Sequence, residues 1–236
     1  PSSGPPSVAT PCNPLSTAPG NRRRGRGGAA DRPARRPGDR RVLRGDGEHV
    51  ITAGGVAHWV KVAGAANDGV PLVLLHGGPG ATHEYMEAFD SYFPQASIEY
   101  YYYDQLGSAF SDQPDEPSLW DLPRFVEEVE QVRAALELEP NNFYLLGHSW
   151  GGLLAIEYAL KYQPRLKGLV ISNMMASIPA YNAYAKHVLM PAMDPKVLAE
   201  VQKIEAAGHY SSPRYMELLV PHFYVAHILR LPPDQW

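Results

Sequence analysis

The stretch that decides the fold, residues 143–152, reads FYLLGHSWGG. Its first four residues are predicted to form a strand, and residues 153–162 are predicted to form a helix that Pro164 closes. The Gly-x-Ser-x-Gly pattern from Gly147 to Gly151 therefore lies between a strand and a helix, which is the setting that a nucleophile elbow requires. Such a turn needs glycine at its flanks and lifts the Ser149 hydroxyl clear of the sheet. We expect Ser149 to be a nucleophile, and the alternative is a purely structural glycine turn.

Strand-like and helical segments alternate on both sides of this stretch. Residues 72–75 are short and continuously apolar, as expected of a strand that is buried on both faces. Residues 122–138 carry their apolar side chains on one helical stripe, with Asp121 as the expected N-cap. Further strands are predicted at 99–104 and 169–172, and a β-hairpin at 49–52 and 56–62. The pattern predicts an α/β fold in which a mostly parallel sheet has helices on both faces.

A second glycine-rich motif follows the buried strand 72–75 directly and reads HGGPG, comprising His76, Gly77, Gly78, Pro79 and Gly80. In serine hydrolases a loop at this place supplies one oxyanion-hole amide, and the residue after the nucleophile supplies the other. Glycine suits such a loop because its backbone can approach a substrate oxygen without a Cβ in the way. We expect the N–H groups of Gly78 and Trp150 to be these donors, and His76 to hold the loop by hydrogen bonds. An ordinary connecting loop is the alternative.

A third motif, DQLGSAFSD at residues 104–112, follows the strand predicted at 99–104. Together the three motifs resemble the proline iminopeptidase family of α/β-hydrolases. That family carries HGGPG, D-Q-x-G-x-G-x-S and G-x-S-W-G-G in this order and at this spacing. Gly147 to Gly152 matches the last motif in full, whereas Ala109 stands where the family usually has glycine. The resemblance covers roughly residues 48–236 and includes the helix that contains residues 125–130.

The resemblance implies an α/β-hydrolase fold and a serine peptidase that removes an N-terminal residue, preferably proline, from a peptide. Ser149 would attack the substrate carbonyl, a histidine would take its proton, and no cofactor or metal would take part. After Ser177 only helical segments are predicted, at 181–190, 196–207 and 213–228. By the resemblance these segments begin a helical cap. We therefore expect an incomplete hydrolase core at 42–176 and an incomplete cap at 177–236.

The other two triad members are not expected in this chain. In this fold the acid and the base follow the nucleophile on loops after later strands. The downstream candidates lack such a strand ahead of them, so we expect surface or cap-packing roles for Asp194, Asp234, His187, His209, His222 and His227. His148, beside Ser149, is expected to pack or bond locally. The resemblance puts the family's Asp and His beyond position 236 and so predicts a C-terminally truncated hydrolase.

Two other functions remain open at this point. An esterase or amidase would use the same scaffold on a small ester or amide, because fold and triad do not fix the substrate. An inactive relative, or an RNA-associated protein that uses its arginine-glycine segment, belongs to a different class. The single cysteine, Cys12, cannot form an internal disulfide, and no His, Cys or carboxylate motif with metal-ligand spacing is present.

Charge is distributed unevenly along the 236 residues, although the formal net charge is only −4. Residues 1–41 hold nine arginines and two acidic residues, while the remainder holds 12 basic and 23 acidic residues. The acidic body argues against nucleic acid as a partner, with the arginine-rich segment as a weak exception. We expect residues 1–41 to be disordered, because they lack apolar anchors. No apolar run is long enough to span a membrane, and no secretory signal is apparent, so we expect a cytoplasmic protein without a membrane partner.

Overall fold

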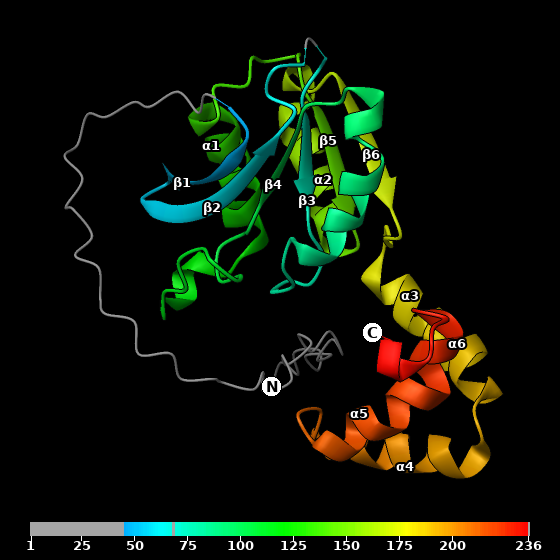
Figure 1. Ribbon diagram of the computed structural model, residues 1–236. Coiled ribbons are helices and arrows are strands. Elements are labelled where there is room, and N and C mark those ends of the chain that lie inside the picture. The colour runs from blue at the N-terminus through cyan, green and yellow to red at the C-terminus, as the bar shows by residue number, and fades with distance from the viewer. Residues whose placement is uncertain (1–44, 68, 236) are drawn as a thin grey trace, which may run out of the picture. The chain divides into compact units, whose positions relative to one another are not determined.

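The computed structural model describes residues 45–67 and 69–235 of the chain (Figure 1). The chain divides into two compact units, whose described parts are residues 45–174 and 175–235. The expectations for residues 1–41 lie outside the described residues. The assignment of residues 42–176 to a hydrolase core and of 177–236 to a cap stays a prediction.

A six-stranded sheet forms the centre of the first unit, with the strand order β1-β2-β4-β3-β5-β6. The first two strands form an antiparallel hairpin, and β2 pairs antiparallel with β4. The remaining neighbours, from β4 to β6, are parallel. The predicted mostly parallel sheet is thus confirmed. Its strands are β1 (Gly47–Ala53), β2 (Val56–Ala63), β3 (Leu72–Leu75), β4 (Tyr100–Tyr103), β5 (Tyr144–His148) and β6 (Gly168–Ser172).

Side chains of the central strands alternate between two apolar clusters, one on each face of the sheet. On β3, Val73 and Leu75 belong to the larger cluster, whereas Leu72 and Leu74 belong to the smaller one. Because successive strand residues point to opposite faces, a strand buried on both sides must be apolar at every position. This requirement explains the uninterrupted run of four apolar residues in β3.

Strand β4 consists of four consecutive tyrosines, all of them buried. Tyr100 and Tyr102 face the smaller cluster, and their hydroxyls donate to the same oxygen, Oδ1 of Asp90, at 2.8 and 2.9 Å. Tyr101 and Tyr103 face the larger cluster. Burial, and then the charge of Asp90, raises the pKa of both Tyr100 and Tyr102. Each of these two rings therefore fills the interior while its polar end reaches a carboxylate.

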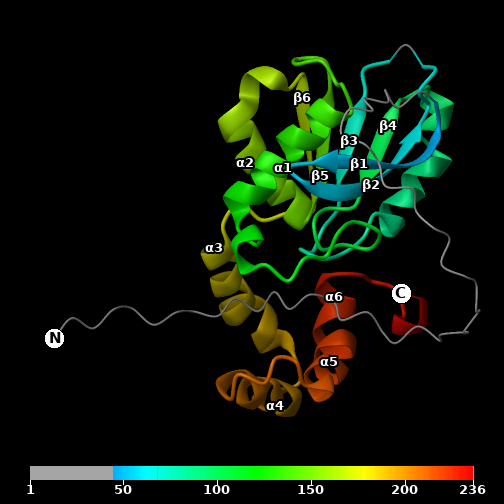
Figure 2. The same ribbon diagram turned by 90° about the vertical axis from the view of Figure 1, so that its left-hand side faces the viewer.

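Two helices, α1 (Leu122–Ala135) and α2 (Trp150–Tyr162), cover one face of the sheet (Figure 2). Asp121 caps α1 as expected, since its carboxylate accepts a hydrogen bond from the Arg124 N–H at 2.7 Å. The other face is covered by the segment between β3 and β4, which forms the 3-10 helices η1 (Glu84–Ser91) and η2 (Pro94–Ala96). The sequence did not predict this segment as helical. Two further short 3-10 turns are η3 (Pro117–Leu119) and η4 (Gln163–Arg165).

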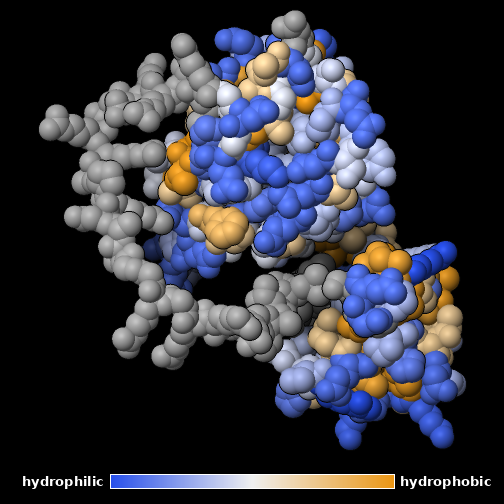
Figure 3. Space-filling model, viewed as in Figure 1, coloured by the Kyte–Doolittle hydropathy of each residue, from blue (hydrophilic) through white to orange (hydrophobic). Residues whose placement is uncertain are grey.

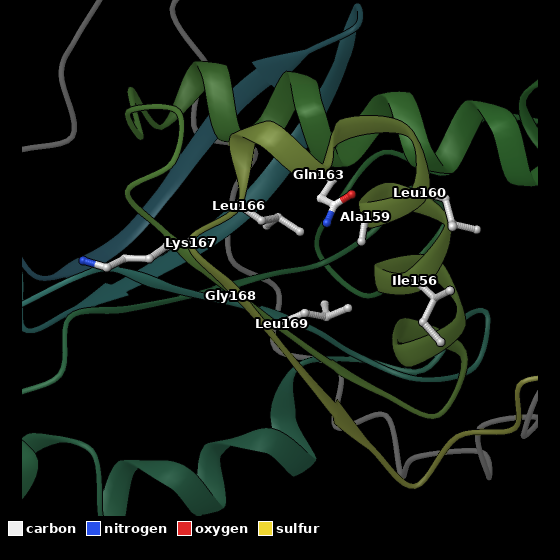
Figure 4. Close-up of a pocket in the computed structure, with 8 residues that line it drawn as sticks. All are labelled: Ile156, Ala159, Leu160, Gln163, Leu166, Lys167, Gly168 and Leu169. Carbon is white, nitrogen blue, oxygen red and sulfur yellow. The ribbon is translucent and has the colours of Figure 1, made fainter.

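Strand β6 ends the sheet on one side within the described residues, and its apolar side chains remain partly exposed. Leu169, Val170 and Ile171 are about 40% exposed. Between α2 and β6 lies an apolar depression of about 440 Å³, lined by residues such as Ile156, Leu166 and Leu169 (Figure 4). None of the residues predicted for the site lines this depression.

The described residues of the second unit, 175–235, form helices joined by turns and contain no strand. Its apolar core includes Val201, Tyr215 and Phe223, but other large apolar side chains such as Val188 and Ile228 stay exposed, and apolar areas appear on its surface in Figure 3. Two stretches are π-helical, η5 (Ala185–Leu189) and η7 (Val220–Tyr224). The other helices are α3 (Ile178–Tyr184), η6 (Met190–Ala192), α4 (Pro195–Ala206), α5 (Pro213–Leu219), α6 (Val225–His227) and η8 (Pro233–Gln235).

Across residues 45–67 and 69–235, every helix is too short or too polar to cross a lipid bilayer.

Two leucines on α2 offer a direct test of how this helix stabilises the sheet. Leu154 is fully buried in the larger cluster, whereas Leu160 is 76% exposed. We predict that Leu154→Ala lowers the free energy of unfolding by about 2–5 kcal/mol, because it leaves a cavity. The matched control Leu160→Ala should change it by about 0.5 kcal/mol or less. Urea unfolding of both variants measures the difference, and equal losses would contradict the observed packing of α2.

Candidate active site

The predicted turn joins β5 to α2 at Ser149, which adopts φ 54° and ψ −122°. Residues other than glycine rarely adopt a positive φ, because their Cβ then crowds the following carbonyl. The surrounding structure holds this conformation on both sides of the residue. The Ser149 N–H donates to the carbonyl of Ser172 at 3.0 Å, and its own carbonyl accepts from the Gly152 N–H at 2.9 Å. Such strain at a single residue is typical of functional sites.

Gly147 and Gly151 make this turn possible by bringing backbone against backbone. A Cβ on Gly151 would lie 2.1 Å from the carbonyl oxygen of Leu75, and a Cβ on Gly147 would lie 2.2 Å from that of Gly151. Real Cβ atoms do not approach oxygen so closely, so neither position admits a side chain. The first turn of α2 is therefore in direct contact with the end of β3.

The HGGPG loop lies beside Ser149. A Cβ on Gly77 would lie 3.1 Å from Ser149 Cβ, so the backbone of Gly77 passes close to the serine. Gly78 has φ +122°, and a Cβ there would lie 2.5 Å from the Gly80 nitrogen. Gly78, Pro79 and Gly80 are exposed, while Gly77 is buried. The structure thus brings the loop and the turn together at the carboxyl ends of β3 and β5.

Of three backbone N–H groups at this site, one donates a hydrogen bond to a protein group and two do not. The Gly77 N–H donates to the Tyr85 hydroxyl at 2.7 Å. In the described part of the chain, the N–H groups of Gly78 and Trp150 have no protein acceptor, and the Ser149 hydroxyl makes no hydrogen bond to a protein group. That these two N–H groups bind a ligand oxygen, as expected from the sequence, stays a prediction.

Tyr85 joins the glycine loop to the turn, a role that no sequence motif indicated. Its hydroxyl accepts from the Gly77 N–H and lies 2.9 Å from Nδ1 of His148. A hydroxyl can accept one hydrogen bond and donate another, so its proton can be donated to His148. Burial lowers the pKa of His148, which favours the neutral imidazole that can accept this proton. His148 therefore bonds locally, as expected.

His76 is fully buried and bridges two loops. Its Nε2 accepts a hydrogen bond from the Gln105 backbone N–H at 3.0 Å, so its proton must reside on Nδ1, which lies 2.9 Å from the Gly77 carbonyl oxygen. Burial lowers the pKa of His76, in agreement with this neutral form. The imidazole thus links the third motif to the HGGPG loop.

The side chain of Gln105 makes a second link between these parts. Its Nε2 donates to the His76 carbonyl oxygen at 2.9 Å, and its Oε1 accepts from the indole Nε1 of Trp150 at 2.9 Å. Gln105 was part of a motif in the sequence, but nothing in the pattern indicated which groups its amide would join. The contact with Trp150 spans 45 residues along the chain.

The remaining residues of the third motif are held by hydrogen bonds to His83 and to Glu128 on α1. The Asp104 carboxylate accepts hydrogen bonds from the N–H and Nδ1 of His83 and from the Phe110 N–H. The Leu106 N–H donates to Glu128 on α1 at 3.1 Å. Ala109, which departs from the family pattern, has φ 33°. This positive φ explains why glycine is usual at the position in the family pattern. Alanine adopts it here at a cost of about 1–2 kcal/mol in conformational free energy.

The six downstream candidates named from the sequence all belong to residues 175–235. Asp194 is the N-cap of α4, where its carboxylate accepts from the N–H groups of Lys196 and Val197. His227 packs edge-on against Phe223, with ring centroids 4.9 Å apart. Over the residues that the structure covers, no three His, Cys, Asp or Glu side chains gather as metal ligands would. The absence of a metal or cofactor stays a prediction.

Comparison with known proteins gives matches over most of this region. A family model described as the α/β-hydrolase fold matches residues 70–210. A proline iminopeptidase of Flavobacterium johnsoniae is 54% identical over 178 residues, which is 75% of this chain and 59% of that protein. Another from Elizabethkingia meningoseptica is 57% identical over 173 residues, which is 73% of this chain and 57% of that protein. The chain therefore spans less than two thirds of the length of these relatives.

Solved structures give the same result. The crystal structure of VinJ matches with a TM-score of 0.73 at 30% identity, and that of a proline iminopeptidase from Mycobacterium smegmatis with 0.67 at 31% identity. Each match covers 79% of this chain and 63% of the other. The resemblance inferred from the three motifs, and with it the fold class, is confirmed.

The buried imidazole of His76 predicts a pH dependence of stability. Its pKa in the fold lies below the ordinary value of 6.5. As the pH falls through 6.5, the unfolded chain binds a proton that the folded chain does not, so stability decreases by up to about 1.4 kcal/mol per pH unit. We predict that His76→Gln, whose amide can neither gain nor lose a proton here, reduces this slope. Urea unfolding between pH 7.5 and 5.5, followed by tryptophan fluorescence, measures it. An unchanged slope would contradict the assignment of a neutral His76.

Proposed function

This chain belongs to the α/β-hydrolase family, and we propose that it carries the nucleophile and the oxyanion-binding groups of a serine peptidase that releases N-terminal proline from peptides. The single observation that carries the proposal is the strained turn at Ser149 with the HGGPG loop directly beside it. The identity of more than half of the aligned residues to two proline iminopeptidases supports the choice of peptide substrate.

In the proposed mechanism, Ser149 attacks the carbonyl carbon of the N-terminal residue, and a histidine takes the hydroxyl proton. The carbonyl oxygen becomes an oxyanion, which the N–H groups of Gly78 and Trp150 bind. Both groups lack a protein acceptor in the described residues, so they are free to donate as the charge develops. The histidine then protonates the leaving amine, and water hydrolyses the acyl-enzyme.

Tyr85 supports this assignment of the donors. It occupies the Gly77 N–H, which removes that group from the possible donors, whereas the Gly78 N–H has no protein acceptor in the described residues. The Gly147, Gly151 and His76 contacts keep the turn and the loop at a fixed spacing. Preorganised donors of this kind stabilise the transition state without reorganising during the reaction.

The acid and the base are proposed to come from sequence that follows the present chain. The Ser149 hydroxyl makes no hydrogen bond within the described residues, and Asp194 already caps a helix. No histidine in residues 45–174 has Ser149 as a hydrogen-bond partner in the part that the structure describes. A cytoplasmic location, and the absence of nucleic-acid and membrane partners, remain predictions.

We predict that the 236-residue chain alone turns over proline p-nitroanilide far more slowly than the same chain joined to a C-terminal segment that supplies the family's Asp and His. Loss of a triad member typically costs on the order of 10⁴–10⁶ in rate. In the extended protein, Ser149→Ala should lower kcat/KM by a similar factor, since no nucleophile remains. The exposed Ser91→Ala serves as the matched control and should retain activity.

Three outcomes decide the proposal. If the short chain equals the extended one, a base must lie among His187, His209, His222 and His227, and the proposed origin of the base is wrong. If the extended protein cleaves p-nitrophenyl esters but no prolyl amide, the hydrolase chemistry stands and the peptidase assignment fails. If Ser149→Ala retains full activity, Ser149 is not the nucleophile.

A further inference from the structure

We propose that Gln105 is a positioning residue that sets the spacing between the two oxyanion-binding N–H groups. The proposal rests on the proposed function, because it concerns the same donors, Gly78 and Trp150. Gln105 makes no hydrogen bond to Ser149 in the described residues, and its partners are His76 and Trp150. It joins the two backbone segments that carry the donors.

The orientation of the Gln105 amide is fixed by its partners. The indole N–H of Trp150 can only donate, and the carbonyl oxygen of His76 can only accept. The amide oxygen must therefore face Trp150 and the amide nitrogen must face His76, each at 2.9 Å. Exchange of the two amide atoms would break both hydrogen bonds, so the side chain has one productive arrangement.

The backbone of Gln105 adds a third connection to the same loop. Its N–H donates to Nε2 of His76, whose Nδ1 reaches the carbonyl oxygen of Gly77. Gln105 is only 1% exposed, so these partners are shielded from solvent. Leaving a buried polar group without its hydrogen-bond partner costs about 1–3 kcal/mol of folding free energy. We expect the glycine loop to shift in response, because it carries the groups that lose their partner.

Gln105 is itself held in place by its neighbours. Asp104 is fully buried and binds the His83 N–H and imidazole, while the Leu106 N–H donates to the buried Glu128 on α1. The residue that spans the two donor segments is therefore fixed on both sides. This arrangement is suited to holding a geometry and not merely to filling space.

The consequence is specific to the transition state. Gly78 follows His76 by two residues, and the Trp150 N–H belongs to the residue whose indole Gln105 binds. Loss of Gln105 should shift one donor relative to the other, while the surfaces that bind the substrate stay unchanged. Oxyanion donors act on charge that develops during the reaction, so the effect should appear in kcat and not in KM.

Two variants of Gln105 test this in the extended protein, assayed with proline p-nitroanilide and with a p-nitrophenyl ester. Gln105→Met removes both side-chain hydrogen bonds at similar size. We expect kcat to fall about 10- to 100-fold on both substrates, with KM within about threefold, because a misplaced donor is lost to the transition state. Gln113→Met is the matched control: Gln113 lies on the same loop and donates to the Ala109 carbonyl, but it is exposed. It should leave kcat unchanged.

Gln105→Glu supplies a readout that a merely structural role would not move. At high pH the carboxylate can accept from Trp150 but cannot donate to His76. Once protonated, it has both an acceptor and a donor and reproduces the amide. The ratio of parent kcat to variant kcat should therefore fall as the pH is lowered from 8 to 5.5. The neighbouring titratable groups His76, His83, Asp104 and Glu128 are present in both proteins, so the pH dependence that the two proteins share cancels from the ratio.

The inference is overturned if Gln105→Met keeps its kcat, or if kcat and KM change together for the ester and the amide. It is also overturned if the kcat ratio of Gln105→Glu does not depend on pH. Loss of prolyl cleavage alone, with the ester effects intact, would refute the peptidase assignment and leave this inference standing. If the parent cleaves neither substrate, NMR decides: unchanged signals of the Trp150 indole N–H and the Gly78 amide in Gln105→Glu would refute the positioning role.

Discussion

The structure around Ser149 depends on the contact between the first turn of α2 and the carbonyl groups at the end of β3. At Gly151 the two backbones approach so closely that a Cβ would lie 2.1 Å from one carbonyl oxygen and 2.6 Å from the next. This contact places the start of α2 directly over the loop that follows β3. A single methyl group at this position would collide with both carbonyl oxygens and force the two segments apart.

The close approach also explains how the chain maintains an unfavourable conformation at Ser149. The positive φ of this residue is offset by hydrogen bonds to Ser172 on one side and Gly152 on the other. Both partners belong to regular elements or their ends, so the strain is distributed into the sheet and the helix. The hydroxyl is consequently held at the rim of the sheet without a hydrogen bond of its own in the described residues. The strained backbone of Ser149 and the close packing of α2 against β3 therefore depend on each other.

The elements that sequence reasoning could predict are those whose cause is local. Glycine at 147 and 151, the alternating apolar faces of β3 and the Asp121 cap each follow from a few adjacent residues. The 3-10 segment that carries Tyr85 lacked a clear periodicity, and it was missed. Links such as Gln105 to Trp150 and Tyr85 to His148 join residues 45 and 63 positions apart, so only the folded chain reveals them. Ala109 was predicted only in part. The motif showed that glycine is usual at this position, and the structure gives the reason, a φ of 33°.

The four consecutive tyrosines of β4 have a consequence for the behaviour of the protein in alkali. Burial raises the pKa of Tyr100, Tyr102 and Tyr103 above the ordinary value of 10.0. Above pH 10 the unfolded chain releases these phenolic protons while the folded chain retains them, so each buried hydroxyl favours unfolding as the solution becomes more basic. The strand at the centre of the sheet therefore sets an upper limit of pH for the fold. Its phenolate absorbance should emerge only as the sheet itself opens.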